Sequence, residues 1–388
     1  MNNFLKINFM KLIILSNLSL LFFILNIPGT IALRNTLAGI LLIILFVSWL
    51  NNDVSIKPMF KNQSFRFIIL ILLILSIYIF FHSIFIADEV SWSLSQYRTQ
   101  WIYPMLYFMI GIFLAFFASL NKWFNKENLI NVLFFTLFLH IIYIDSFVIY
   151  QYIETGQFLT RYGGITGSPA LANYITNILI SMIIVEFIHR YRTELKIIQL
   201  NDVCLFLSMI LCIFSSIIEG MRFGAISLFF ITGASLVFLT YDNKKLNKKF
   251  KTFLSLSLLI ICILPLLFNA KSDERWASLI ETISVASSDT SNYWMIKEKD
   301  WDVREVPKLA SGELVSHSNY ARIAWIVKGF EYISKDVFGI GYGKNIFGHA
   351  IEKYEDNFNT WRVESVITTV RGMHSHSSII DFTIGVGL

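Results

Sequence analysis

Long apolar stretches separated by short polar segments dominate the chain. Crossing a hydrocarbon core of roughly 30 Å takes about 20 helical residues. Nine stretches are long enough, at roughly 9–27, 32–50, 65–87, 101–119, 128–150, 169–188, 202–218, 223–240 and 252–270. Each is continuous and nearly uncharged, which predicts helices and not the alternating strands of an outer-membrane barrel. The pattern predicts an all-α polytopic membrane protein with nine complete transmembrane helices and a truncated tenth that begins at Ser377.

Composition and charge support this prediction and add an orientation. Hydrophobic residues make up 55% of the chain, charged residues 15%, and the mean hydropathy is +0.60. With the N-terminus inside, the short cytoplasmic segments carry fifteen lysines and arginines, whereas the short loops on the other side carry four, Arg34, Arg98, Arg161 and Arg222. This asymmetry predicts a cytoplasmic N-terminus. The net charge of +5 comes mostly from these cytoplasmic lysines and arginines, which anchor the spans at the membrane surface, and it indicates no nucleic-acid partner.

The positions of the apolar stretches divide the chain into three parts. Residues 1–270 form a transmembrane helical bundle with short loops, 271–376 form one large, partly helical loop outside the cytoplasm, and 377–388 begin a further transmembrane helix. The last part has twelve residues, too few to cross a membrane, so we expect the chain to be the front part of a longer protein. Residues 281–316 have scattered polar side chains that indicate a mobile segment.

Two arginines on the predicted outer side have distinctive settings. Arg222 follows Glu219 and Gly220 in a very tight turn between two spans. Its guanidinium is suited either to clamp phosphate oxygens or to anchor the interface in a pair with Glu219. Arg161 precedes a loop with three glycines and a helix start at Pro169, whose free N–H groups suit an anion. The glycines are equally explained as simple turn residues.

Histidines supply the candidate bases. His374 and His376 lie where the long loop meets the last apolar segment, and histidine titrates near physiological pH. His140 and Asp145, inside the fifth span, are either functional intramembrane groups or a buried hydrogen-bonded pair. No ligand spacing links the remaining loop histidines, so we expect no metal site.

Within the long loop, residues 319–333 predict an amphipathic helix lying on the membrane surface. Its apolar stripe consists of Ile323, Ile326, Val327, Phe330 and Ile333. The glycines that follow, Gly339, Gly341 and Gly343, occupy alternate positions and predict a turn, not a dinucleotide-binding loop.

Taken together, these residues resemble the superfamily of O-antigen ligases and O-antigen polymerases, which are bacterial inner-membrane glycan transferases. The likeness covers roughly 160–388 and rests on the turn 221–225, on the loop 161–173, on a helix with Arg322 and Trp325 that ends in alternating glycines, and on a histidine motif. That motif is His-Ser, nine residues, then Gly. His376 with Gly387 fits it, and so does His374 with Gly385; we prefer His376 because the closing position of the other register is the mismatched Leu388. Val337, Ser168 and Ala170 depart from the family's usual residues.

The resemblance implies an enzyme of the bacterial cell inner membrane in lipopolysaccharide biosynthesis, with its long loop in the periplasm. The donor would be a glycan on undecaprenyl diphosphate, and the acceptor a lipid A–core sugar hydroxyl or a growing glycan. Arg222, Arg322 and Arg161 would bind the diphosphate, and His376, with His374 as the second choice, would act as the base of an inverting transfer that needs no cofactor and no metal. An O-antigen polymerase and a protein O-oligosaccharyltransferase share this chemistry and stay open as alternatives. A transporter of lipid-linked sugars is the remaining alternative, although no internal repeat supports it.

Overall fold

The computed structural model describes residues 2–50, 61–120, 124–241, 278–288, 307–355 and 378–387, together with the isolated helical positions 252, 256, 263 and 267. Over these ranges the chain is helical and contains no strand, only an isolated bridge between Lys308 and Leu314. Four helices are long and apolar enough to cross a membrane: α4 (Gln63–Phe85), α7 (Lys126–Thr155), α8 (Pro169–Thr193) and α9 (Asp202–Glu219). The described residues also include shorter apolar helical segments, among them Phe9–Ile24 and Ile31–Val47. The helical membrane-protein class is thus supported, whereas the predicted number of spans stays a prediction.

The chain divides into two compact units. Unit 1 comprises Met1–Ile56 and Ile110–Asp273, and unit 2 comprises Lys57–Met109 and Glu274–Leu388. The second of the three divisions along the chain, between Met109 and Ile110, falls inside α6 (Tyr103–Leu120). Residues 57–109, which the hydropathy pattern places in one bundle with all other spans, therefore pack with the C-terminal part of the chain.

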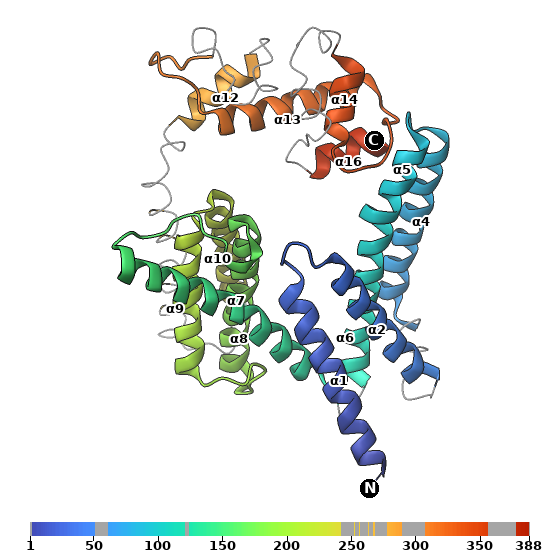
Figure 1. Ribbon diagram of the computed structural model, residues 1–388, viewed down its shortest axis with the longest axis vertical. Helices are drawn as coiled ribbons and strands as arrows, with labels where there is room; N and C mark the ends of the chain where they lie inside the picture. Colours follow the sequence, from blue (N-terminus) through green and yellow to red (C-terminus); the bar gives the residue numbers. More distant parts are fainter. Residues whose placement is uncertain are drawn as a thin grey trace. The chain divides into compact units, whose positions relative to one another are not determined.

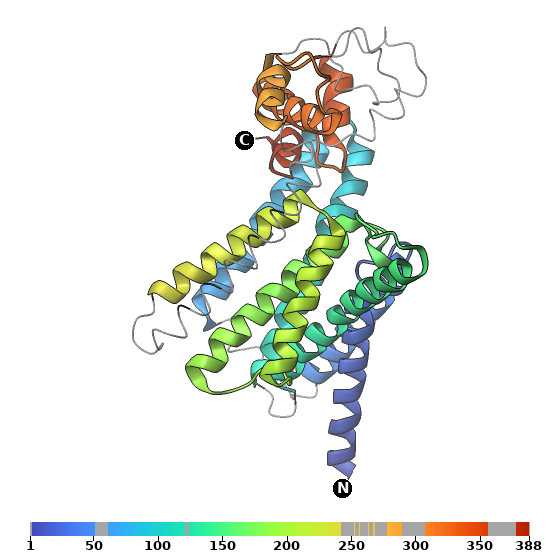
Figure 2. The same ribbon diagram turned by 90° about the vertical axis from the view of Figure 1, so that its left-hand side faces the viewer.

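Unit 1 is a bundle of α1 (Asn2–Ile24), α2 (Ile31–Leu50), α7, α8, α9 and α10 (Arg222–Tyr241). Helix α1 packs along α7 and α2, and α8 packs beside α9, as Figures 1 and 2 show. The core between α7, α8 and α9 consists of aliphatic and aromatic side chains, chiefly Phe134, Ile141, Ile175, Leu179, Ile183, Leu205 and Cys212. Burying these side chains against one another is what selects the mutual arrangement of the helices.

Local signals place the ends of these helices. The side chain of Asn125 accepts a hydrogen bond of 3.0 Å from the amide of Asn128 and caps α7, and Asn201 caps α9 in the same way. Helix α8 begins with Pro169 in its first turn. Gly156 and Gly220 end α7 and α9 in the left-handed conformation that glycine adopts without strain. The ends of α7, α8 and α9 lie within a few residues of those predicted from hydropathy, except that α7 and α8 each run five residues further.

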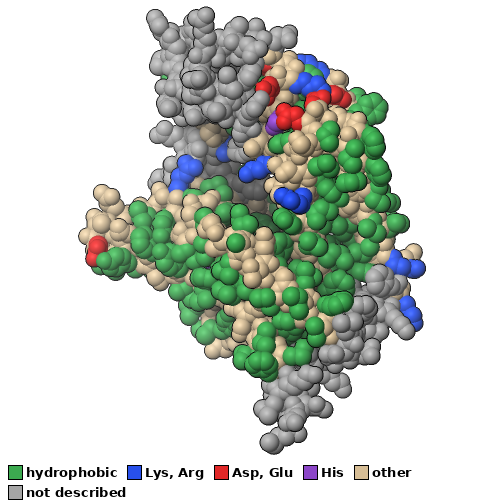
Figure 3. Space-filling model, turned by 45° about the vertical axis from the view of Figure 1, so that its right-hand side comes forward, with side chains coloured by type: hydrophobic (Ala, Val, Ile, Leu, Met, Phe, Trp, Pro, Cys, Tyr) green, Lys and Arg blue, Asp and Glu red, His purple; other side chains and the backbone are tan. Residues whose placement is uncertain are grey.

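Unit 2 contains α4, α5 (Val90–Gln96), the π-helical segment η1 (Tyr97–Ile102), α12 (Leu279–Ser288), α13 (His317–Lys335), α14 (Ile346–Tyr354) and α16 (Ser378–Val386). Its core lies between α13, α14 and α16, around Tyr320, Tyr332, Phe347, Ile351, Ile380 and Ile384. Figure 1 shows α13 running from α12 toward α14 and α16. Much of the surface drawn in Figure 3 is hydrophobic, as expected for helices that face lipid.

One prediction for the long loop needs correction, and a second is confirmed only in part. Residues 279–288, assigned in part to a mobile segment, form α12, because Thr282 and Ala286 lie one turn apart and pack against α13. Helix α13 exists as predicted, but it packs inside unit 2 through Tyr320, Ala321 and Ala324. Three members of the predicted stripe, Ile326, Val327 and Phe330, are exposed, and Phe330 has 63% of its surface accessible. This exposed stripe keeps open the predicted contact with the membrane surface.

Candidate functional site

Arg222, the predicted anion-binding residue, follows a two-residue turn between α9 and α10 in unit 1. Helix α9 ends at Glu219, Gly220 takes the left-handed conformation with φ of 57°, and α10 begins at Arg222. Only two residues therefore separate the helices, and the backbone of Arg222 is held at the first position of α10. Its side chain lies outside the described residues.

The structure brings Arg161 to the same turn. Its backbone amide donates a 2.7 Å hydrogen bond to the carbonyl of Ile218, in the last turn of α9. A Cβ atom placed on Gly220 would lie 3.4 Å from Cγ of Arg161, so the loop and the turn are in direct contact. Arg161 itself has φ of 58°, a left-handed conformation that is uncommon for a residue other than glycine, asparagine or aspartate. Residues held in such strained conformations cluster at functional sites, because surrounding contacts must maintain them.

Beneath this turn, the buried carboxylate of Glu219 joins α9 to α8. One oxygen accepts a 2.7 Å hydrogen bond from Nδ2 of Asn173, and the other accepts a 2.5 Å bond from the hydroxyl of Thr176. Glu219 is fully buried and Asn173 is 5% exposed. Because leaving a buried carboxylate without donors is costly, these two bonds set the position of the α9 end relative to α8.

Gly224 extends this arrangement to α10. A Cβ atom on Gly224 would collide with the side chain of Asn173, so only glycine lets α10 approach α8 this closely. Asn173 thus contacts both Glu219 and the backbone of α10. Four segments meet here: the 161–168 loop, the start of α8, the end of α9 and the start of α10.

The loop glycines serve the folding of the loop itself. A Cβ atom on Gly163 would collide with the backbone of Ser168, and one on Gly164 would lie 2.6 Å from the side chain of Ile144. The hydroxyl of Thr166 donates to the carbonyl of Gly163 at 2.6 Å and closes the loop. The turn interpretation of these glycines accounts for their positions without a ligand. The Ser168 side chain makes no capping bond at the start of α8.

His140 and Asp145 are both buried, yet they do not form the hydrogen-bonded pair offered as one alternative. Nε2 of His140 lies 2.8 Å from the carbonyl of Phe23, on α1. Asp145 accepts a 2.5 Å bond from the hydroxyl of Ser215, on α9, and its other oxygen has no partner among the described residues. Each side chain thus links α7 to a different neighbour, which is typical of polar groups that fasten membrane helices.

In unit 2, Arg322 lies exposed on α13. The segment 338–343, which contains the alternating glycines, forms a strap that packs against α16. The amides of Ile340 and Gly341 donate to the carbonyls of Ile384 and Gly385 at 3.1 and 2.9 Å. A Cβ atom on Gly339 would lie 2.6 Å from the backbone of Gly385. The predicted turn is present, and it packs backbone against backbone, which requires residues without side chains.

Two polar residues of α4 that the sequence did not single out hold this strap and the end of α16. Nε2 of His82 lies 2.6 Å from the carbonyl of Phe338, and the hydroxyl of Tyr78 donates to the carbonyl of Val386 at 2.5 Å. Their spacing of four residues places them on one face of α4. A histidine and a tyrosine four residues apart in an apolar span could have indicated that this face of α4 contacts protein, because polar side chains in membrane helices usually face protein.

His374 and His376 lie outside the described residues, and α16 begins two positions after His376. Across the residues that the structure describes, no three side chains of histidine, cysteine, aspartate or glutamate gather as metal ligands. His349 packs against Trp92 with ring centroids 4.2 Å apart.

Comparisons of this chain with protein-family models, with curated proteins and with solved structures find no match.

Proposed function

We propose that this protein transfers a glycan from an undecaprenyl diphosphate carrier to a sugar hydroxyl of the lipid A–core, at the periplasmic face of a bacterial inner membrane. The observation that carries the proposal is the docking of the Arg161 loop on the α9–α10 turn, through the 2.7 Å bond from Arg161 to Ile218. Two of the three arginines that the sequence suggests for diphosphate binding thereby originate from neighbouring backbone at one end of unit 1.

The physical argument concerns charge. A lipid diphosphate leaving group carries negative charge that grows as the glycosidic bond breaks. Guanidinium groups stay protonated and match phosphate oxygens with paired donors. Held in place by the backbone of Arg161 and by the first turn of α10, they stabilise that charge without a metal ion. The N–H groups at the start of α8 add a weaker positive potential.

The proposed reaction is a single displacement. His376 accepts the proton of the acceptor hydroxyl, the oxygen forms a bond to the anomeric carbon from the opposite side, and the bond to the diphosphate breaks with inversion. Undecaprenyl diphosphate leaves with the electron pair. The role of His376, and of Arg322 as a further diphosphate ligand, rests on the family resemblance alone.

Complementation of a strain lacking this gene tests the proposal. Arg161→Gly removes the guanidinium and keeps the left-handed backbone accessible, whereas Arg161→Lys keeps one charge. We expect Arg161→Gly and Arg222→Ala to lower transfer about 100-fold or more, as loss of one stabilising donor does elsewhere. We expect His376→Ala to abolish transfer, and Arg34→Ala, which changes a partly exposed arginine in the first turn of α2, to leave it unchanged.

The surface polysaccharide is the readout, with membrane insertion measured in parallel. Loss of long chains from the lipid A–core, with polymer accumulating on the carrier, supports ligase activity. A single repeat still attached to the core indicates a polymerase instead. Full activity of Arg161→Gly, Arg222→Ala and His376→Ala would contradict both.

A further inference from the structure

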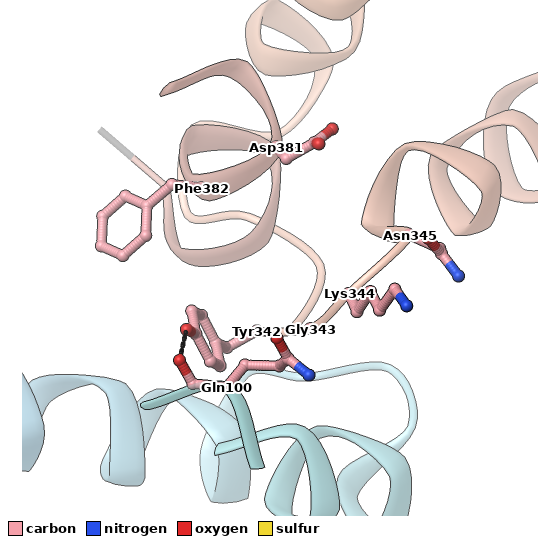
Figure 4. A pocket seen from close by; sticks show the side chains of 7 residues that line it. All are labelled: Gln100, Tyr342, Gly343, Lys344, Asn345, Asp381 and Phe382. Atoms are coloured by element: carbon pink, nitrogen blue, oxygen red, sulfur yellow. Dashed lines mark hydrogen bonds between the residues drawn. The ribbon is translucent and has the colours of Figure 1, made fainter. Parts of the chain in front are cut away.

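A second site is formed within unit 2, beside the glycine strap. It is a cavity of about 390 Å³, lined by Gln100, Tyr342, Gly343, Lys344, Asn345, Asp381 and Phe382 (Figure 4). Its volume lies within the range of about 300–1,000 Å³ typical of small-molecule pockets. None of these residues belongs to the predicted diphosphate site.

Two aromatic rings form one side of this cavity. Figure 4 shows Tyr342 and Phe382 on the same side, and their ring centroids are 6.2 Å apart with planes at 76°. The hydroxyl of Tyr342 donates to the backbone carbonyl of Gln100 at 3.2 Å, and the hydroxyl of Ser93 donates to the carbonyl of Tyr342 at 3.1 Å. Burial raises the pKa of Tyr342, so its hydroxyl stays protonated as a donor at neutral pH. Tyr342 is thus fixed both at its hydroxyl and at its backbone carbonyl.

Polar side chains supply the remaining lining. Lys344 and Asn345 lie across from the rings in Figure 4, and the amide of Gln100 extends from below. Asn345 precedes α14 in a left-handed conformation with φ of 63°, and its side chain makes no capping bond. Asp381 adds a carboxylate from the first turn of α16. Amide and carboxylate groups together offer both donors and acceptors.

This combination selects among ligand classes. A phosphate group would meet the carboxylate of Asp381 and a single lysine, with no arginine in the lining. A lipid chain would bury the polar groups of Gln100 and Asn345 without hydrogen bonds, which is unfavourable. A saccharide unit satisfies both parts, because its C–H face packs on aromatic rings and its hydroxyls bond to amides and carboxylates.

We propose that this pocket binds one saccharide unit, with a sugar face against Tyr342 and Phe382 and hydroxyls bonded to Asp381, Asn345 and Gln100. That the sugar is the acceptor of the transfer rests on the proposed function. Asp381 follows His376, the predicted base, by five residues, so their Cα atoms are at most about 18 Å apart. The acceptor hydroxyl is the group that this base would deprotonate.

Ligand-observed NMR on the full chain in lipid nanodiscs, prepared without glycoside detergents, tests the binding directly. The probes are glucose, galactose, N-acetylglucosamine and lactose, with pyrophosphate as the anionic comparison. We expect saturation transfer to at least one saccharide. Phe382→Leu, Asp381→Asn and Gln100→Ala should each weaken its binding about tenfold, which corresponds to about 1.4 kcal/mol.

Matched controls come from the same unit. Phe330→Leu changes an exposed phenylalanine of α13, and Glu313→Gln neutralises an exposed carboxylate, both outside the cavity lining. Neither should change binding. The proposal is overturned when no saccharide binds, when the pocket variants bind as the wild type does, or when pyrophosphate competes for the same residues. Saccharide binding in a protein that performs no glycan transfer would contradict the proposed function and leave this pocket assignment standing.

Discussion

Unit 1 joins its helices through buried hydrogen bonds between polar side chains, whereas unit 2 joins its segments largely through backbone groups and through ion pairs at or near the surface. In unit 1, Glu219 and Arg190 each make two buried hydrogen bonds. In unit 2, the strap hydrogen-bonds through main-chain groups to α16 and to the amide of Asp88, in the loop after α4. The α4 side chains of His82 and Tyr78 bond to main-chain carbonyls of the strap and of α16. Polar groups in an apolar bundle must find partners inside it, whereas a unit with more polar surface can leave its charges at the surface.

The largest expected effect concerns Arg190, which is 9% exposed at the end of α8. Its guanidinium donates to Glu186 at 2.7 Å, to Asp202 at 2.6 Å and to the carbonyl of Ile198 at 2.7 Å. Arg190→Met leaves Glu186 buried without its cation, which we expect to lower the free energy of unfolding by about 3–5 kcal/mol. Unfolding of the purified protein in mixed micelles measures this loss.

The double variant Arg190→Met/Glu186→Met sharpens that test, because it removes both buried charges. We expect it to recover most of the lost stability. A double variant as unstable as the single one would show that the ion pair is not what holds this end of unit 1.

The next effect concerns the strap of unit 2. Gly339→Ala places a methyl group against the backbone of Gly385 at a residue with φ of 78°. Strain and overpacking together should lower the free energy of unfolding by roughly 3 kcal/mol. Gly312→Ala is the matched control, since Gly312 has φ of 87° and open space around it, and it should lose only about 1 kcal/mol. Equal losses in thermal unfolding of the two variants would contradict the close packing of the strap.

A smaller effect is expected beneath the α9–α10 turn. Thr176→Val keeps the shape of the side chain and removes the hydroxyl that donates to Glu219. We expect a loss of about 1–2 kcal/mol, because the buried carboxylate keeps only its bond from Asn173. Ser181→Ala, on the same helix, removes only a bond to a carbonyl of its own helix and should have a much smaller effect.

The smallest effect belongs to the surface ion pairs of unit 2. Hydrogen bonds from Lys335 at 2.8 Å and Lys328 at 3.0 Å outweigh burial and lower the pKa of Glu331 below its ordinary value of 4.5. A lowered pKa in the folded state means that the stabilisation is present above pH 4.5 and is lost as the pH falls through the folded value.

Because Glu331 is 41% exposed, the stabilisation should be only about 0.2–1 kcal/mol and should shrink with added salt. Glu331→Gln should therefore differ from the wild type at pH 7 in low salt and converge with it at acidic pH. A difference that persists at low pH would assign the effect to packing instead of charge.

Much of the helical framework was predictable, because long apolar stretches leave no other way to satisfy the backbone in a membrane. Hydropathy placed both ends of α9 and the start of α7 within two residues, but it ended α7 five residues too early, since the helix continues to Thr155, just before the Gly156 that terminates it. Helix α12 was not predictable, because its buried face consists of Thr282 and Ala286, which carry little hydrophobic signal. The same holds for the pocket, whose lining comes from segments as distant as Gln100 and Asp381.

Residue types and their spacing alone determined a membrane-embedded helical protein and singled out Arg161 and Arg222 as candidates for binding an anion. The tertiary structure decided that the Arg161 loop docks on the turn before Arg222, and that the alternating glycines pack against α16. It also showed that Arg190, one of several basic residues assigned by the charge asymmetry to one side of the membrane, is a buried residue that forms ion pairs with Glu186 and Asp202. Hydropathy reports how each segment interacts with its solvent, whereas these contacts depend on which distant segments share a buried surface, and only the folded chain specifies that.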